Sequence, residues 1–361
     1  MVKKGISSLE LTALVQELQF ITGGKIDQIY HQQEKELLLQ VHVPRHGKVL
    51  VRIVPGKFLC QTTKKEVLLK PSSFCMQLRK YLDNANIKQF YQKGSERIMV
   101  LELEKKETFF LIIELFSKGN IILTNEKYNI IGVLEAHTWK DREVKVGVTY
   151  VFPVPAVDWQ HLTSPQLEKL LQKSQKSSVV TALATEIGFG GMYAEELCLR
   201  AKLEKEKKPK DLSHQEIEAL FKVLQGLLQE IKTPRGYVYS ENITPFALQG
   251  QTTLKETATY SEAIDTLNPF LKPSPYEQKI KSLHRMIEAQ QESVAKQEKV
   301  ITENTTKADL IYARYQPLQK MLTIVKELRE KKNWQEVAAE LKKEKKIKQV
   351  DLKEKKVVVE L

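Results

Sequence analysis

The chain has 361 residues, of which 42% are hydrophobic and 28% charged, and this balance predicts two or three domains with a globular core beside a polar helical part. Its formal net charge of +12 favours a polyanionic partner. Because no long apolar run and no signal peptide occur, we expect nucleic acid rather than a membrane as that partner. The three cysteines form no CxxC pair, and no P-loop, GxGxxG or HExxH motif is present. We therefore expect a cytoplasmic protein with no metal site, no disulfide framework and no cofactor.

Residues 1–155 are expected to form a mixed domain of helices and strands. A helix is predicted from Ser7 or Ser8 to about Ile21, with Ser8 as its cap and Leu11 at the position where a capping box has Glu. Apolar and alternating stretches separated by turn residues then predict strands and hairpins, over residues 25–30, 36–43, 48–53, 58–61, 108–114, 121–124 and 133–137.

Residues 74–104 predict a helix followed by a buried strand. Apolar side chains recur at helical spacing from Phe74 to Leu82, and the strand is expected from Ile98. Between them lies Gly94-Ser95-Glu96-Arg97, where an adjacent acid and base at a strand entrance can hold a guanidinium in one direction. Arginine presents donors that suit phosphate or a base edge, and glutamate can orient it. The alternative is a surface ion pair at a strand end.

Residues 164–267 predict short helices, with Pro165 at the start of the first. Gly188, Gly190 and Gly191 lie between two of these helices. They let the backbone turn tightly and leave N–H groups at a helix N-terminus, where phosphate can bind. A plain helix-to-helix turn is the alternative. The lysines that follow add positive potential or form a solvated face with interleaved glutamates, and they are Lys202, Lys205, Lys207 and Lys208.

Beyond a proline-containing linker, a heptad repeat predicts a long helix from Tyr276 to about Gln316. Its period near 3.5 residues predicts a left-handed coiled-coil arm of about 60 Å at ~1.5 Å per residue, and Pro317 is expected to kink or end it. Polar residues weaken one row in the middle, which favours a specific partner helix over a self-dimer. The other row contains Ile280, Ile287, Val294, Ile301, Ala308 and Tyr315.

The last stretch begins with a short helix at Trp334 and ends in a strand-like segment over residues 355–361. A run of lysines lies between them without interleaved aromatic residues. A solvated face and a contact with ribosomal RNA both fit this run, which is made of Lys342, Lys343, Lys345, Lys346 and Lys348.

Three stretches resemble the N-terminal domain of the Rqc2/RqcH family, also called NEMF or Tae2 and formerly fibronectin-binding protein A-like. They are residues 74–82, 94–103 and 111–126, and their order and spacing match the family along most of the chain. The resemblance implies a transfer-RNA-binding role for Glu96 and Arg97, which stand where the family has Gly-x-Asp-Arg, and for Glu10, which stands where it has Ser-Ser-Phe-Asp-Leu. Glu replaces Asp in both motifs. The resemblance also assigns the phosphate-binding role of a helix-hairpin-helix segment to Gly188, Gly190 and Gly191.

The fold class implied by the resemblance is α+β, in four parts. A mixed N-terminal α/β-sheet domain, related to the N-terminal fold of formamidopyrimidine-DNA glycosylases, is expected over residues 1–155. A helical helix-hairpin-helix domain follows over 160–270, then a coiled-coil arm over 275–332 and the start of a small middle module over 333–361. In the family a returning coiled-coil helix and a C-terminal RNA-binding domain come next, so we expect a fragment or a shortened member.

Family members bind a large ribosomal subunit that carries a stalled peptidyl-tRNA, recruit transfer RNA, and support template-free alanine tailing. The resemblance therefore implies an RNA-binding component of ribosome-associated quality control. No catalytic residue is expected, because the ribosome makes the bond, and the arm is expected to contact the ribosome or a partner helix.

Two other functions are alternatives to this one. A DNA glycosylase-lyase on the related fold would need an N-terminal proline followed by Glu, whereas Val2 and Lys3 follow Met1 here, and it would need a four-cysteine zinc finger. An extracellular adhesin, suggested by the older family label, does not fit a basic chain in which no signal peptide is found.

Overall fold

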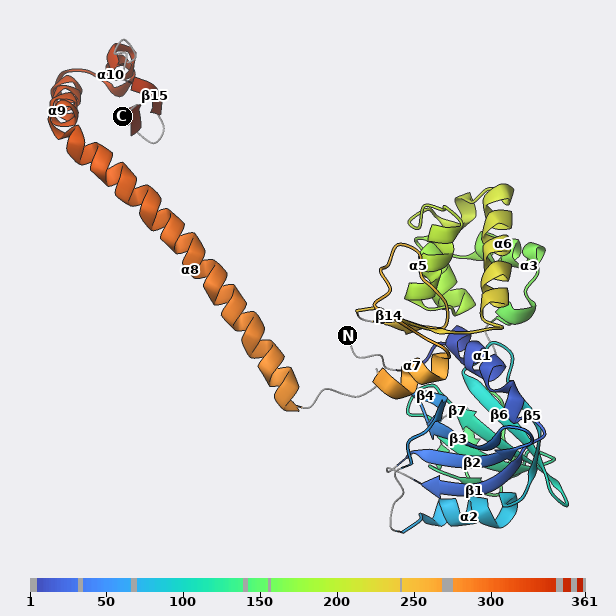
Figure 1. Ribbon diagram of the computed structural model, residues 1–361. Coiled ribbons are helices and arrows are strands. Elements are labelled where there is room, and N and C mark those ends of the chain that lie inside the picture. Colours follow the sequence, from blue (N-terminus) through green and yellow to red (C-terminus); the bar gives the residue numbers. More distant parts are fainter. Residues whose placement is uncertain are drawn as a thin grey trace. The chain divides into compact units, whose positions relative to one another are not determined.

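The computed structural model describes residues 5–31, 35–65, 70–138, 142–154, 157–240, 242–267, 275–341, 347–351 and 356–359. The chain forms two compact units, Met1–Lys272, here called the body, and Pro273–Leu361, here called the arm unit. The predicted α+β class is confirmed, since the body combines a large sheet with helices and the arm unit is mainly helical (Figure 1). The predicted lysine run over residues 342–348 lies largely outside the described residues.

A nine-stranded antiparallel sheet forms the first half of the body, in the order β4-β3-β2-β1-β5-β6-β7-β8-β9 (Figure 1). Both halves of the sheet are meanders, and Lys25 of β1 pairs with Asn86 of β5 where they join. The strands are β1 (Lys25–His31), β2 (Leu37–Val43), β3 (Gly47–Val54), β4 (Phe58–Thr62), β5 (Asn86–Gln92), β6 (Ile98–Glu104), β7 (Thr108–Glu114), β8 (Asn120–Asn125) and β9 (Ile130–Val133). A short pair, β10 (His137–Thr138) and β11 (Glu143–Val144), follows.

Strand β5 is the main element of this sheet that the sequence patterns did not predict. Its burial alternates irregularly, and its register with β6 shifts between Ile87 and Gln89. A strand with a bulge lacks the strict period of two on which the prediction depends. The stretch 74–104 is therefore a helix followed by a β-hairpin.

Strand β6 is continuously apolar from Ile98 to Leu101 because both of its faces are buried there. Met99, Leu101 and Leu103 point into the main core, which also receives α1 (Ser8–Glu17) and α2 (Ser73–Leu82). Ile98 and Val100 point into a smaller apolar cluster on the other face. A continuous apolar run is the pattern expected of a strand covered on both sides.

The N-cap of helix α1 lies one residue before the predicted cap. Ser7 is the N-cap, and its hydroxyl accepts a hydrogen bond from Glu10 N at 3.2 Å. The Glu10 carboxylate accepts in turn from Ser7 N at 2.7 Å. The predicted cap at Ser8 was wrong, because Glu10 stands three residues after Ser7 and completes a capping box there.

The second half of the body is mainly helical and shares α1 with the sheet. Leu9 and Ala13 of α1 belong to the helical core, whereas Leu11 and Leu14 belong to the main core, and Figure 1 shows α1 between the two halves. The helical elements are η2 (Trp159–His161), α3 (Ser164–Lys173), α4 (Val179–Ala182), the π-helical turn η3 (Leu183–Ile187), α5 (Gly191–Arg200), η4 (Pro209–Asp211), α6 (His214–Glu230) and α7 (Tyr260–Leu267).

A small sheet that the patterns did not predict links this half back to the first. Its strands, β13 (Ile243–Thr244), β12 (Gly236–Val238) and β14 (Lys255–Thr257), pair in that order. Val238, Ile243 and Tyr260 are part of the main core. These strands have only two or three residues each, so they carry no usable periodic signal.

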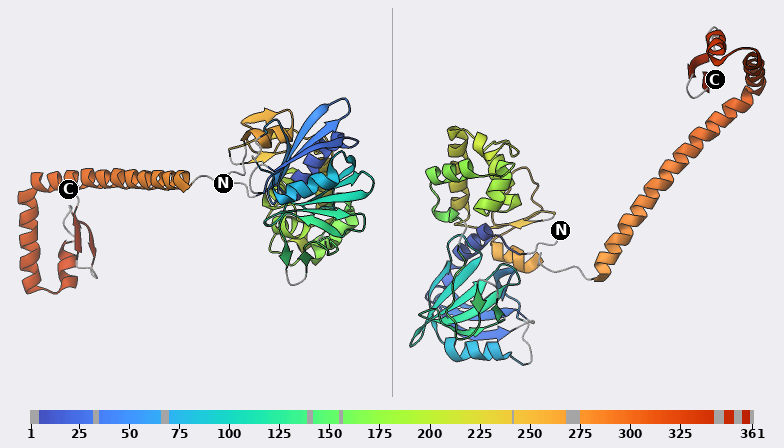
Figure 2. Two further views of the ribbon diagram at one scale, coloured as in Figure 1. Left: turned by 90° about the horizontal axis from the view of Figure 1, so that it is seen from below. Right: turned by 180° about the vertical axis from the view of Figure 1, so that it is seen from behind.

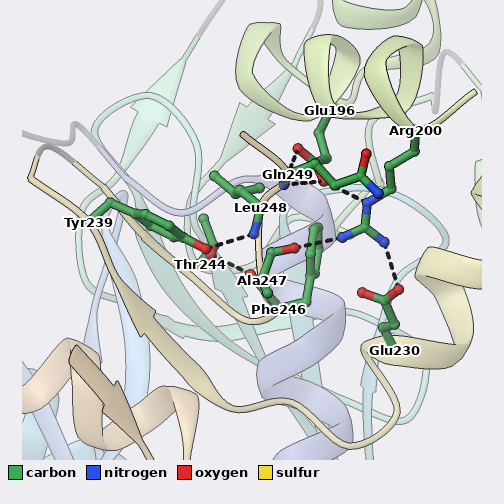
Figure 3. A network of polar contacts seen from close by, with 9 residues as sticks. All are labelled: Glu196, Arg200, Glu230, Tyr239, Thr244, Phe246, Ala247, Leu248 and Gln249. Carbon is green, nitrogen blue, oxygen red and sulfur yellow. Dashed lines mark hydrogen bonds and ion pairs between the residues drawn. The ribbon is translucent and has the colours of Figure 1, made fainter. Parts of the chain in front are cut away.

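Arg200 holds the C-terminal end of α5 in a polar network (Figure 3). Its guanidinium donates to Glu196 Oε1, Glu230 Oε1 and Ala247 O, each at 2.6 Å. Glu196 also accepts from Gln249 N at 3.0 Å, so the same network fixes the segment between β13 and β14 of the small sheet. Helix α5 is thus tied to α6 and to residues 247–249, which holds the helix in position.

The arm unit consists of one long helix followed by a small helical and hairpin part (Figure 2). Helix α8 (Pro275–Ala313) ends three residues before the predicted end. Arg314 interrupts it, and Pro317 lies in the first turn of α9, where proline is tolerated. The remaining elements are α9 (Tyr315–Lys331), α10 (Trp334–Leu341), β15 (Ile347–Asp351) and β16 (Lys356–Val359). Among the described helices, none is both long and apolar enough for a membrane span.

Candidate nucleic-acid interface

The Gly94–Arg97 motif lies in the loop of the β5–β6 hairpin. Lys93 N donates to Ile98 O at 2.9 Å, and Glu96 N donates to Lys93 O at 3.1 Å, which closes the loop. Gly94 has a φ of +51°, in the region that favours glycine. The motif therefore connects two strands. It lies at the entrance of the strand that begins at Ile98, as predicted, and the unpredicted strand β5 separates it from α2.

Two glutamine side chains hold this loop against its surroundings. Gln92 Nε2 donates to Glu96 O at 2.8 Å and to Ser8 Oγ at 3.1 Å. Gln160 Nε2 donates to Gly94 O at 2.9 Å. The loop backbone is thus bonded to α1 on one side and to η2 on the other.

Ser95 adds a third attachment at the centre of the loop. Its side chain is buried, and its hydroxyl donates to Asp158 Oδ1 at 2.8 Å and accepts from Gln160 N at 3.2 Å. Its carbonyl accepts from the Ser8 hydroxyl. A loop bonded at this many points keeps the following Glu96 and Arg97 in a defined position.

A pocket of about 300 Å³ collects residues from four separate parts of the body. Glu96 and Arg97 of the hairpin loop line it together with Gly188 and Gly190 of the turn before α5. The structure thus brings together four of the six predicted site residues, across about ninety positions of sequence. The other lining residues are Ser7, Ser8, Ser95, Val157, Ala184, Ile187 and Phe189.

Arg97 has an unusual environment inside this pocket. Its side chain is half-buried, and within the part of the chain that the structure describes its guanidinium makes no hydrogen bond and no ion pair. Burial lowers the pKa of Arg97, and the nearby Glu96 carboxylate opposes that shift. Partly buried cations are normally paired, because removing a charge from water is costly. The five guanidinium donors are therefore available to a ligand.

The glycine turn has the backbone geometry that requires glycine. Gly188 and Gly190 have φ values of +95° and +78°, and a Cβ added at either position would meet no other atom within 4 Å. Backbone conformation, rather than lack of space, therefore explains both glycines. Phe189 N and Gly190 N donate to Leu183 O and Ala184 O, so these two N–H groups close the π-helical turn. Gly190 is the N-cap of α5, and Gly191 begins that helix outside the pocket lining.

Glu10 lies behind the pocket and not in its lining. It is fully buried, and besides Ser7 N its carboxylate accepts from the Tyr193 hydroxyl at 2.6 Å. Tyr260 also hydrogen-bonds to it. Burial, with the nearby Glu10 charge, raises the pKa of Tyr193 well above its ordinary value, which keeps its hydroxyl a donor. Glu10 therefore joins α1 to α5 and α7, and its buried position prevents direct contact with a ligand in this conformation.

The lysines that follow α5 are partly neutralised. Lys205 Nζ lies 3.0 Å from Glu195 Oε1, and Lys207 Nζ lies 2.8 Å from Glu216 Oε1. These two lysines form the solvated, paired face that was the alternative to a phosphate-binding patch.

A family model described as NFACT N-terminal and middle domains matches residues 7–360. The chain belongs to the NFACT family. The archaeal Rqc2 homolog aRqcH of Methanocaldococcus jannaschii is 30% identical over 360 residues, which cover 92% of this chain and 53% of that protein. The human ribosome quality control complex subunit NEMF is 25% identical over 287 residues, or 74% of this chain and 26% of NEMF. The resemblance to the Rqc2/RqcH family is confirmed, and the chain spans about half or less of these two relatives.

The N-terminal part of the fibronectin/fibrinogen-binding protein from Streptococcus suis has a similar structure, with a TM-score of 0.62. The two are 20% identical, and the match covers 73% of this chain and 99% of that one. At this identity the similarity supports the fold alone. The matched 73% of this chain is close to the share of its residues that the body contains.

Several residues that hold the loop beside the Arg97 pocket were not predicted from the sequence. Gln92, Asp158 and Gln160 belong to no recognisable motif, and their partners lie up to 148 positions away. Ser7 carried a usable signal, because a Ser followed three residues later by Glu is a capping box. Cys60, Cys75 and Cys198 are buried free thiols, and no cluster of potential metal ligands occurs among the described residues.

Proposed function

We propose that this chain binds transfer RNA through the pocket around Arg97. The observation that carries the proposal is the half-buried guanidinium of Arg97, which has no partner among the described residues and lines a pocket. A phosphate group of the RNA backbone would supply the missing partner in a bidentate contact. Tight attachment of the loop by Gln92 and Gln160 would spare the cost of ordering it on binding.

Two helix N-termini reinforce the attraction of this pocket for an anion. Ser7, the N-cap of α1, and Gly190, the N-cap of α5, both line it. The N-terminus of a helix carries a partial positive charge that favours phosphate. Glu10 supports this arrangement indirectly, since its bonds to Ser7 and Tyr193 fix both helix starts. Glu96 would steer Arg97 through its charge rather than through a hydrogen bond.

The proposed setting is ribosome-associated quality control. The relatives named above are an Rqc2 homolog and a ribosome quality control complex subunit. By this proposal the chain binds a large ribosomal subunit with a stalled peptidyl-tRNA and supports template-free alanine tailing in the cytoplasm. It makes no bond itself, so no residue is proposed as catalytic, and the arm over residues 275–332 contacts the ribosome or a partner helix. The net charge of +12 suits an RNA partner.

Substitutions at Arg97 test the proposed contact directly. Arg97→Lys keeps the charge but loses the planar fork, so a bidentate contact predicts weaker transfer-RNA binding by about 1–3 kcal/mol. Arg97→Ala should weaken binding at least as much. Arg235→Ala, which removes one exposed arginine outside the pocket lining, is the matched control. Affinity is measured at one fixed salt concentration, with circular dichroism to verify folding.

The result that contradicts the proposal is wild-type affinity in folded Arg97→Ala. Full recovery in Arg97→Lys would reduce the role of this residue to general positive potential. Glu96→Asp restores the residue usual at this position and should be tolerated. Glu96→Gln should weaken binding if the Glu96 charge steers Arg97, although less repulsion with RNA opposes that effect.

Salt dependence tests the electrostatic part of the proposal separately. If about 4 to 6 phosphates are neutralised, the slope of log affinity against log salt should be roughly −3 to −5. A flat response would show that phosphate contacts do not dominate binding.

A further inference from the structure

The two walls of the Arg97 pocket come from separate parts of the body. The hairpin loop with Glu96 and Arg97 forms one wall, here called the loop wall, and the turn with Gly188 and Gly190 forms the other, here called the turn wall. One anion can contact both walls only if the distance between them is fixed, because binding groups must be held to about 0.5 Å. Residues that fix this distance therefore contribute to binding without touching the ligand.

One tripeptide, Asp158-Trp159-Gln160, contacts both walls and is here called the clamp. It forms the start of η2, with Asp158 as the N-cap. The preceding Val157 lines the pocket, but the lining that the structure describes contains none of the three clamp residues. A substitution in the clamp therefore removes no direct contact with a ligand in the pocket.

The clamp contacts the loop wall through hydrogen bonds. Asp158 Oδ1 accepts from the Ser95 hydroxyl at 2.8 Å, and Gln160 N donates to the same hydroxyl at 3.2 Å. Gln160 Nε2 donates to Gly94 O at 2.9 Å and to Gln92 Oε1 at 3.2 Å. These bonds fix the loop directly before its charged pair.

The clamp contacts the turn wall through an apolar pair. Trp159 is 1% exposed and lies in the core of the helical half. Its ring centroid is 5.3 Å from that of Phe189, which lies between the two glycines of the turn wall. Phe189 is also 1% exposed and lines the pocket. Because two aromatic rings in a close-packed core have little room to shift, Trp159 fixes the turn wall relative to the clamp.

Helix α1 also joins the two walls, but in a different way. The Ser8 hydroxyl donates to Ser95 O, and the Glu10 carboxylate accepts from the Tyr193 hydroxyl of α5. Ser7 and Ser8 themselves line the pocket, so substitutions at the start of α1 change the lining and the wall positions together. The clamp allows the wall positions to be changed alone.

We propose that Gln160, together with Asp158 and Trp159, is a positioning residue for transfer-RNA binding. The clamp holds the loop wall at the distance from the turn wall at which one RNA phosphate contacts the Arg97 guanidinium and lies at the N-terminus of α5. The inference rests on the proposed function and adds residues that no sequence motif marks. It predicts that the advantage of arginine over lysine at position 97 depends on the clamp.

Gln160→Ala tests the clamp without changing any charge. It should weaken binding of unfractionated transfer RNA on the order of tenfold at fixed salt, and it should leave the slope of log affinity against log salt unchanged. In this background Arg97→Lys should have little further effect, because a displaced guanidinium makes no bidentate contact that lysine could lose. Gln215→Ala, at an exposed glutamine of α6, is the matched control.

Asp158→Ala separates positioning from simple electrostatics. The substitution removes a negative charge beside the pocket, so electrostatic attraction alone predicts tighter RNA binding. Loss of the Ser95 contact predicts the opposite, and we expect binding to weaken about fivefold. Asp211→Ala makes the same charge change at an exposed residue of η4, so this control should bind at least as tightly as the wild type. The thermal unfolding midpoint verifies that each variant is folded.

Support requires weaker binding by both folded clamp variants and loss of the Arg97→Lys penalty in Gln160→Ala. Additive effects of Gln160→Ala and Arg97→Lys overturn the inference, and so does tighter binding by Asp158→Ala. If both clamp variants bind like the wild type while Arg97→Ala loses binding, the inference is overturned and the proposed function stands. Wild-type affinity in folded Arg97→Ala overturns both. If neither clamp variant folds, the inference is overturned as well, because the clamp then serves the fold alone.

Discussion

Apolar side chains are buried in strand β6 of the body and exposed in helix α8 of the arm unit. Leu101 in β6 is 1% exposed, whereas Ile287 and Ile301 in α8 are 48% and 63% exposed. Both segments have a regular apolar pattern in the sequence. In β6 the residues that cover the pattern lie elsewhere in the same chain, but in α8 no described residue covers it.

This difference shows that a periodic apolar pattern predicts an element and a face, but not the partner of that face. Helix α8 has 39 residues, long enough for its own hydrogen bonds to sustain it. Its predicted pairing in a coiled coil stays a prediction, because no residue that the structure describes covers the exposed row and identifies a partner. The body needs no such partner, since its cores are filled by its own residues.

Matched leucine substitutions should give the largest contrast between the two units. Leu101→Ala leaves a cavity in the main core and should lower the free energy of unfolding by about 2–5 kcal/mol. Leu283→Ala in α8, where the side chain is 46% exposed, should change it by less than about 0.5 kcal/mol. Urea unfolding followed by circular dichroism and tryptophan fluorescence measures both. Equal losses would show that α8 is packed in solution.

Glu10→Gln tests the buried contact that links the two halves of the body. The amide retains one acceptor oxygen for the donors Ser7 N and the Tyr193 hydroxyl. A buried donor left unsatisfied should cost about 1–3 kcal/mol. The measurement is the thermal unfolding midpoint, with Tyr193→Phe as a second variant of the same contact. An unchanged midpoint in both would mean that Glu10 does not hold α1 to α5.

A smaller effect is expected from pH at the start of α6. Lys207, together with the Ser213 cap, lowers the pKa of Glu216 from 4.5 to about 2. Because the folded-state pKa is the lower one, the charged carboxylate stabilises the fold above pH 4.5, and this contribution is lost as the pH falls towards about 2. Glu216→Gln should remove about 1 kcal/mol at neutral pH.

The urea midpoint of Glu216→Gln, measured across that pH range, checks this expectation. The variant and the wild type should converge at the acid end. Glu206→Gln, at an exposed glutamate nearby, is the control and should follow the wild type throughout. A constant gap between Glu216→Gln and wild type at every pH would contradict the assignment.

The smallest effect is expected from charges placed on the exposed row of α8. Ile287→Lys with Ile301→Lys should leave the unfolding of the body unchanged within about 0.5 kcal/mol, because both positions are exposed. If the arm has a partner helix, the same double variant should abolish that association in sedimentation or pull-down measurements. A destabilised body would show that the two units unfold together.

Much of the fold could be predicted where local pattern and structure agree. The hairpins of β2 with β3 and of β7 with β8, the helix α2 and the long α8 all follow from apolar spacing and turn residues. Strand β5 and the small sheet of β12 to β14 could not, because a bulge or a length of two or three residues removes the period. The cap of α1 could have been predicted from Ser7 and Glu10.

The sequence by itself determined the candidate residues Glu96, Arg97, Gly188 and Gly190, because a charged pair after glycine and a glycine-rich turn are local patterns. Only the tertiary structure decided that these four line one pocket and that Glu10 is buried behind it. It also decided that Gln92 and Gln160 hold the loop. The physical reason is that these arrangements depend on contacts between residues far apart in the chain, whereas periodicity and capping report only on residues within a few positions of each other.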